Sequence, residues 1–168
     1  MHDLPQLCES VASYMSSAAE KLRRENAVCE AIQVFVQTNP FREQDPQYSK
    51  SITVPLPNAS SDTRLLVRAA LFGLKRIYRP GFAYKKTGVM LIGIGPAAVR
   101  QLSLLPQHGA GDKSQRLMDA MDRLNQVYGR NTLSVFSTAK RKSWAMRREN
   151  MSPSYTTSWQ DVPVAYAH

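Results

Sequence analysis

The 168-residue sequence lacks several features that would place it in a common protein class. It has only two cysteines, Cys8 and Cys29, which show no C-x-x-C spacing, and its three histidines (His2, His108 and His168) lie far apart. Neither a disulfide framework nor a zinc site is indicated by this pattern. We therefore expect two reduced thiols that pack as small hydrophobic side chains.

The sequence also has no long apolar run. No stretch approaches the roughly 20 apolar residues that span a bilayer, and the N-terminus lacks the charged head and apolar stretch of a secretory signal. We therefore expect a cytoplasmic protein with no membrane partner.

Groups that carry catalysis are equally sparse. The acidic residues are scattered over expected helix surfaces and loops, and no nucleophile triad is recognisable. The segment Gly93 to Ala98 superficially fits the phosphate turn G-x-G-x-x-A, but only about ten residues separate Pro96 from Pro106 and no parallel strand follows. A nucleotide-dependent enzyme is thus a remote alternative. We expect no catalytic residue, no metal ligand and no cofactor in this chain.

What the sequence does have is positive charge. The net charge is +9, from 22 Lys and Arg against 13 Asp and Glu. No acidic residue occurs between Thr63 and Gly111, whereas that segment holds Arg64, Arg68, Lys75, Arg76, Arg79, Lys85, Lys86 and Arg100. Such an excess favours a polyanionic partner with phosphate groups. A solvated basic surface without a ligand is the alternative.

Apolar periodicity predicts the order helix, strand, strand, helix, strand in the first 95 residues. Steps of three and four residues predict a helix that ends near Arg24. Alternation predicts strands over Ala31–Thr38 and Lys50–Pro55, each with one polar face. A further strand is expected over Tyr84–Gly93.

The second helix is expected to begin after the N-cap candidates Ser60, Ser61 and Asp62 and to stop at Arg79-Pro80-Gly81. Its apolar side is assigned to Leu66, Ala69, Ala70, Phe72, Leu74 and Ile77. Residues 93 to 111 are rich in Gly and Pro and predict a linker. Beyond it, a helix from Ser114 that closes at Gly129 and a short strand over Asn131–Phe136 are expected.

The linker contains a peptide with the character of a short binding motif, made of Gln101, Leu102, Ser103, Leu104 and Leu105. A polar anchor followed by spaced leucines fits a partner with one polar and one apolar pocket. Exposed apolar residues in a linker usually have a partner. The alternative is a linker that packs back on its own domain.

Five segments together resemble the C-terminal part of the UmuC family, the bacterial Y-family subunit of DNA polymerase V and its plasmid-borne relatives. They occur in the order and spacing of that family: Ala18-Ala-Glu-Lys-Leu-Arg23, Thr38-Asn-Pro-Phe41, Tyr84-Lys-Lys-Thr-Gly-Val-Met-Leu91, Gln101 to Leu105, and Met151-Ser-Pro-Ser-Tyr-Thr-Thr157. The resemblance covers nearly the whole chain.

The resemblance implies an α+β fold, a small mixed or antiparallel sheet backed by two helices. Residues 1–95 would be a little-finger domain that binds DNA, 96–112 a linker, and 113–168 a small helix-plus-strand domain peculiar to UmuC-like proteins. The family's little finger starts with a strand, whereas this chain starts at the first helix. We therefore expect the first strand to be missing from the sheet, and an unfilled sheet edge is a liability.

The resemblance also implies partners. Gln101 to Leu105 is similar to the family's sliding-clamp-binding peptide, which commonly ends in Phe where this chain has Leu105, so weaker clamp binding is expected. Residues from about Ser114 onward correspond to a region implicated in contacts with the processed UmuD dimer and the recombinase filament. Magnesium would belong to the palm of the polymerase, whose carboxylates are absent from this chain.

The expected function is therefore that of a non-catalytic C-terminal region of a translesion polymerase in SOS mutagenesis. Its DNA contacts are assigned to the outward faces of the strands (Gln33, Gln37, Ser51 and Thr53) and to their basic flanks (Lys50, Arg79, Lys85 and Lys86). Such backbone contacts position DNA without reading its sequence. The alternative is a truncated, stand-alone interaction module that binds clamp or polymerase partners.

Overall fold

The structure is a computed structural model that describes residues 3–98, 110–129 and 132–135. The elements follow one another as α1 (Leu4–Arg24), β1 (Ala27–Thr38), β2 (Ser49–Ser60), α2 (Thr63–Ile77), β3 (Tyr84–Ile92), β4 (Gly95–Pro96) and α3 (Ala110–Tyr128). The strand pairings are antiparallel. The predicted α+β class with a small antiparallel sheet is therefore confirmed.

Strand β1 lies at the centre of the sheet, between β2 and β3. In the register of pairing, Val34 lies between Ile52 of β2 and Val89 of β3. Alternate residues of a strand point to opposite faces, and Ile32, Val34 and Val36 are fully buried on one of them. The predicted alternation in this strand is confirmed.

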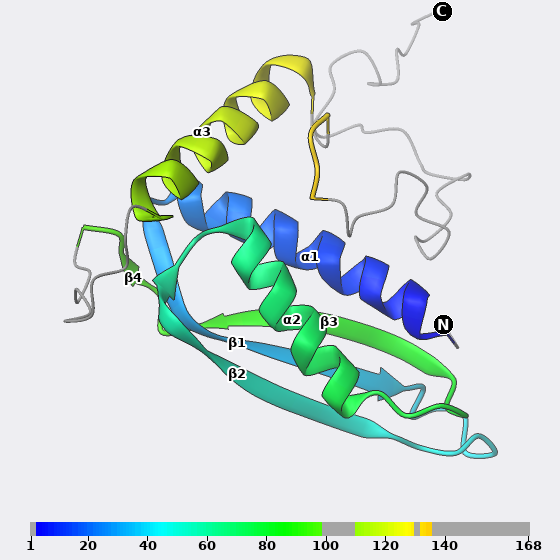
Figure 1. Ribbon diagram of the computed structural model, residues 1–168. Coiled ribbons are helices and arrows are strands. Elements are labelled where there is room, and N and C mark those ends of the chain that lie inside the picture. The colour runs from blue at the N-terminus through cyan, green and yellow to red at the C-terminus, as the bar shows by residue number, and fades with distance from the viewer. Residues whose placement is uncertain (1–2, 99–109, 130–131, 136–168) are drawn as a thin grey trace, which may run out of the picture.

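Helices α1 and α2 lie side by side over this buried face of the sheet (Figure 1). Their contribution to the core includes Leu7, Val11, Met15, Leu66 and Leu74. Helix α2 comes close to the sheet at Gly73, where a Cβ would lie 3.0 Å from Val54 Cγ2 and 3.2 Å from Ile52 Cγ2. A larger residue at this position would push the helix away from β2.

The predicted linker overlaps secondary structure at both of its ends, so its predicted bounds were wrong. After an interruption at Gly93 and Ile94, strand β4 continues β3 in an unchanged register and pairs with Ala27 and Val28 of β1. Gly95 and Pro96 thus extend the sheet, whereas in the turn of a nucleotide site they would leave the sheet to open a helix. At the other end, α3 begins at Ala110, before the predicted Ser114.

The strand predicted over Asn131–Phe136 is not present in its described part, residues 132–135. Asn131 and Phe136 themselves lie outside the described residues. The side chain of Asn125 forms hydrogen bonds with both backbone groups of Leu133: its Oδ1 accepts from the N–H at 2.8 Å, and its Nδ2 donates to the carbonyl at 2.9 Å. Leu133 is thereby held against the end of α3.

Arg23, whose side chain is 5% exposed, joins helix α3 to the rest of the fold. The guanidinium donates to both carboxylate oxygens of Asp122 at 2.7 Å. Its third nitrogen donates at 2.8 Å to the carbonyl of Ser61 and to Oγ1 of Thr63. One arginine of α1 therefore links the start of α2 to α3.

A second polar contact reaches α3 from the N-cap of α2. Asp62 accepts from the backbone N–H of Arg64 at 2.8 Å, as expected for an N-cap, and also accepts from the hydroxyl of Ser114. Burial raises the pKa of Asp62, but hydrogen bonds from Arg64 and Ser114 outweigh it and lower the pKa to about 2. Met118, one turn after Ser114 in α3, is also buried.

Replacing Asp62 with Asn should remove part of the acid sensitivity of the fold. The folded-state pKa of about 2 lies below the ordinary 3.8, so the ionised form stabilises the fold above about pH 4 and this contribution is lost as the pH falls toward 2. We expect the difference in unfolding free energy between wild type and Asp62→Asn, measured in urea, to shrink across this range. A difference independent of pH would contradict the assignment.

Arg23 and Asp122 should differ in their effect on stability. Asp122→Ala leaves the Arg23 guanidinium, whose side chain is 5% exposed, buried without its anion, so we expect a loss of about 3 kcal/mol. Arg23→Ala removes in addition the bonds to Ser61 and Thr63, so we expect a loss that is larger by about 1 kcal/mol. Urea unfolding of the two variants measures the difference, and equal losses would show that the bonds to α2 contribute little.

Candidate nucleic-acid interface

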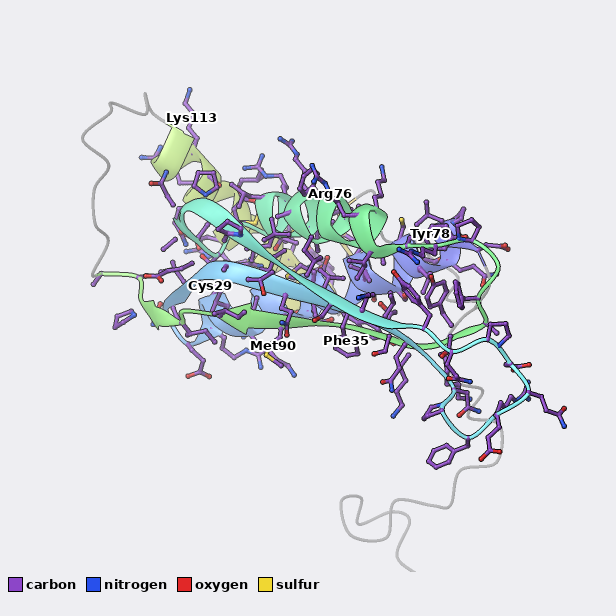
Figure 2. The ribbon with its side chains drawn as sticks, turned by 90° about the horizontal axis from the view of Figure 1, so that it is seen from below. Cys29, Phe35, Arg76, Tyr78, Met90 and Lys113 are labelled. Carbon is purple, nitrogen blue, oxygen red and sulfur yellow. The ribbon has the colours of Figure 1, made fainter. Side chains whose placement is uncertain are left out.

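The second face of the sheet is turned away from α1 and α2 and is formed by every second residue of three strands. We call this surface the open face. In cross-strand rows it consists of Pro55–Ala31–Ile92, Thr53–Gln33–Met90, Ser51–Phe35–Gly88 and Ser49–Gln37–Lys86. Figure 2 shows Phe35 and Met90 on the side of the sheet opposite to α2.

The structure brings several predicted DNA-contact residues together on the open face: Gln33, Gln37, Ser51, Thr53 and Lys86. Gln33 Nε2 lies 3.5 Å from Thr53 Oγ1, so the two polar side chains are neighbours across β1 and β2. Gln37 lies directly between Ser49 and Lys86. The open face thus presents a series of hydrogen-bonding side chains, and its last row contains the cation of Lys86.

The remaining predicted residues, Lys50, Lys85 and Arg79, flank the open face at this same end of the sheet. Lys50 is paired with Val36 and so alternates toward the helix side, at the exposed start of β2. Lys85 lies where the register between β1 and β3 shifts. Arg79 follows α2, and its guanidinium carbon lies 5.5 Å from the centroid of the Tyr48 ring.

An aromatic cluster that the sequence analysis missed holds this end of the sheet together. The ring of Tyr48 lies 4.8 Å from that of Phe82 and 6.1 Å from that of Tyr84, centroid to centroid. The Tyr84 hydroxyl donates to the carbonyl of Arg79 at 2.8 Å and accepts from its N–H at 2.9 Å. Burial raises the pKa of the Tyr84 hydroxyl above its ordinary value. The cluster therefore fixes the backbone at Arg79.

The centre of the open face is apolar. A Cβ on Gly88 would lie 2.6 Å from Phe35 Cζ, which means that the Phe35 ring occupies the space above this glycine. Met90, next along β3, is 55% exposed, and Ile92 follows it. The open face is thus polar and basic at the end of Lys86 and apolar at the end of Ile92.

The charge at the polar end is suited to phosphate groups. Lys50, Lys85 and Lys86 are exposed and have no carboxylate partner within the described part of the chain. In the nearby loop, Asp45 pairs with Arg42 at 3.7 Å. Cationic side chains beside amide and hydroxyl groups can bind a sugar-phosphate backbone without reading bases.

The described residues show no comparable arrangement for catalysis or metal binding. A pocket where β4 meets the start of β1 is lined by Glu25, Asn26, Ala27 and residues 94–98, and Glu25 is its single titratable side chain. No cluster of three or more His, Cys, Asp or Glu side chains in the described segments is placed to hold a metal ion. Over the same segments, no helix combines the length and apolarity needed to cross a membrane.

The two cysteines are free thiols, as predicted. Cys29 is fully buried, and burial raises its pKa to about 11. The predicted clamp peptide, Gln101 to Leu105, lies outside the described residues, between Ala98 and the start of α3. Its role stays a prediction.

Two family models match the chain. Residues 1–104 match the impB/mucB/samB family C-terminal domain. Residues 115–165 match a domain of unknown function, DUF4113. The first match contains the whole sheet with α1 and α2, and the second begins within α3.

Curated relatives extend over almost all of the chain. Protein UmuC of Salmonella typhimurium is 38% identical over 160 residues, which is 95% of this chain and 38% of the relative. Protein ImpB of Salmonella typhimurium is 35% identical over 97% of the chain, and protein MucB of Escherichia coli 37% identical over 96%, again covering 38% of each relative. The chain thus spans less than half the length of these relatives, and it belongs to the UmuC, ImpB, MucB and SamB family through the C-terminal domain of that family.

Proposed function

We propose that this chain is the DNA-gripping and clamp-tethering C-terminal region of a UmuC-type translesion DNA polymerase that acts in SOS mutagenesis and DNA repair. The observation that carries the proposal is the open face: a sheet covered by helices on one side only, in a chain of this family, with Gln33 two rows from the row that holds Gln37 and Lys86. In this proposal residues 1–95 act as a little finger that holds the duplex near a damaged template.

The open face would bind DNA through its sugar-phosphate backbone. Lys86, with Lys85 and Lys50 beside it, would neutralise phosphate groups, and Gln33 and Gln37 would donate to phosphate or sugar oxygens. Contacts of this kind tolerate any base, and a lesion leaves them intact. A grip that ignores base identity is what synthesis past a damaged template requires.

Polymerisation itself would belong to another part of the parent protein. The family's nucleotidyl transfer uses two magnesium ions held by carboxylates. In this proposal magnesium belongs to that other part of the protein.

The peptide Gln101 to Leu105 would tether this region to the sliding clamp. Gln101 would enter a polar pocket of the clamp, and Leu104 and Leu105 an apolar one. In the sequence, the peptide begins five residues after Pro96, the end of β4, and precedes α3. Residues 113–168 would contact the processed UmuD dimer and the recombinase filament.

Removing the charges of Lys85 and Lys86 should reduce the salt dependence of DNA binding. For Lys85→Gln/Lys86→Gln we expect the slope of log K against log salt, measured by fluorescence anisotropy on a blunt duplex, to fall by about 0.9 for each lost phosphate contact. The control Lys21→Gln/Arg24→Gln removes two charges from α1 and should leave the slope unchanged. Equal slopes for all three proteins would exclude these lysines from the DNA site.

The tether can be tested separately from the DNA grip. Gln101→Ala/Leu104→Ala should weaken binding to purified sliding clamp at least about 10-fold, because both anchors of the peptide are lost. The same variant should bind duplex DNA like the wild type. Clamp binding that survives the double substitution would overturn the assignment of the peptide, whereas clamp binding without any salt-sensitive DNA binding would favour a pure interaction module.

A further inference from the structure

Helix α2 has a basic outer surface that the proposed duplex grip does not use. Its solvent-facing side chains share a single arc of the helix and include four cations and two apolar groups: Arg64, Leu65, Arg68, Phe72, Lys75 and Arg76. We call this arc the α2 stripe. Phe72 was predicted to lie on the apolar side of this helix with Leu66 and Leu74, but it is 51% exposed, so that prediction was wrong.

The packing of α2 fixes the direction of the stripe. The opposite arc holds the buried residues Leu66, Ala70 and Leu74, and Gly73 lies against the side chains of β2. The α2 stripe therefore points away from the sheet, on the other side of the domain from the open face. Figure 2 shows this separation: Arg76 lies on one side of the ribbon, and Phe35 and Met90 lie on the other.

The cations of the stripe are mostly unneutralised. Arg64 pairs with Asp62 at 2.8 Å, whereas Arg68, Lys75 and Arg76 have no carboxylate partner among the described residues. Three cations on one exposed arc of a helix, without a carboxylate beside them among the described residues, are suited to a polyanionic ligand.

The aromatic ring identifies which polyanion the stripe suits. The guanidinium carbon of Arg76 lies 4.8 Å from the centroid of the Phe72 ring, so ring and guanidinium form one continuous surface in the middle of the cations. Bases stack on exposed aromatic rings and on arginine planes. A duplex keeps the faces of its bases stacked inside, whereas a single strand can offer them.

We propose that the α2 stripe binds single-stranded nucleic acid, with Arg68 and Arg76 on phosphate groups and Phe72 under a base. Arg68 and Arg76 are eight residues apart, which is about 12 Å along the helix axis, and Phe72 lies midway between them. A flexible single strand can adjust its phosphates to this spacing. An acidic protein segment would satisfy the charges equally well but does not require the exposed ring.

The test measures binding of the 168-residue chain to a fluorescent oligothymidylate of 16 nucleotides across a salt series. Arg68→Gln/Arg76→Gln should lower the slope of log K against log salt by about 1.4, because each lost phosphate contact on a single strand contributes about 0.7. Phe72→Ala should weaken binding about 5- to 150-fold, and Phe72→Trp should retain it. Lys21→Gln/Arg24→Gln is the charge-matched control and should bind like wild type.

Two outcomes would overturn the proposal. One is that Arg68→Gln/Arg76→Gln and Phe72→Ala bind oligothymidylate as strongly as the control Lys21→Gln/Arg24→Gln does. The other combines two results: Phe72→Ala leaves oligothymidylate binding unchanged, and Arg68→Gln/Arg76→Gln loses binding to a fluorescent polyglutamate peptide. This combination would assign the surface to an acidic protein. Lys85→Gln/Lys86→Gln should keep its oligothymidylate binding, so failure at the open face and failure at the stripe can be told apart.

Discussion

The one-sided burial of strand β1 is the constraint on which the rest of the structure depends. Because β1 lies between β2 and β3, its residues Ile32, Val34 and Val36 form the centre of the buried face of the sheet. Helices α1 and α2 cover this face (Figure 1). The period of two along a strand then sends Gln33, Phe35 and Gln37 to the other face. A register slip of one residue would exchange the two sets and destroy both the core and the open face.

The same two-layer construction separates two cationic surfaces. The basic end of the open face is held in place by the aromatic cluster around Tyr84, and the α2 stripe is held by the close approach of Gly73 to the sheet. One surface is flat and rich in hydrogen-bonding groups, which suits a duplex backbone. The other is convex and centred on an exposed ring, which suits an unstacked base.

Local patterns predicted the elements of the fold, since alternation marks β1 and the N-cap at Asp62 marks the start of α2. They missed features that depend on partners distant in sequence. Arg23 looks like an ordinary basic residue at a helix end, but its partner Asp122 lies 99 residues away. The pairing of Gly95–Pro96 with Ala27 and Val28 is equally non-local, and neither segment alternates.

The candidate site shows the same division. Strand parity predicted that Gln33, Gln37, Ser51 and Thr53 share one face, because parity is a local property. The position of Lys50 depends on the register between β1 and β2, and that of Lys85 on the irregularity in the pairing of β1 with β3. The sequence shows neither of them. Phe72 was misplaced because an apolar residue at helical spacing normally belongs to the core. Its exposure follows from the rotation of α2 that Gly73 and Leu74 fix.

The central claim is that the open face grips duplex DNA, and chemical-shift mapping by NMR on the 168-residue chain with a blunt duplex tests it most directly. The account predicts that shifts concentrate on Gln33, Phe35, Gln37, Lys86 and Met90, while the amides of α1 stay unchanged. Shifts confined to the helices, or no shifts at a salt concentration where the chain binds DNA, would contradict it.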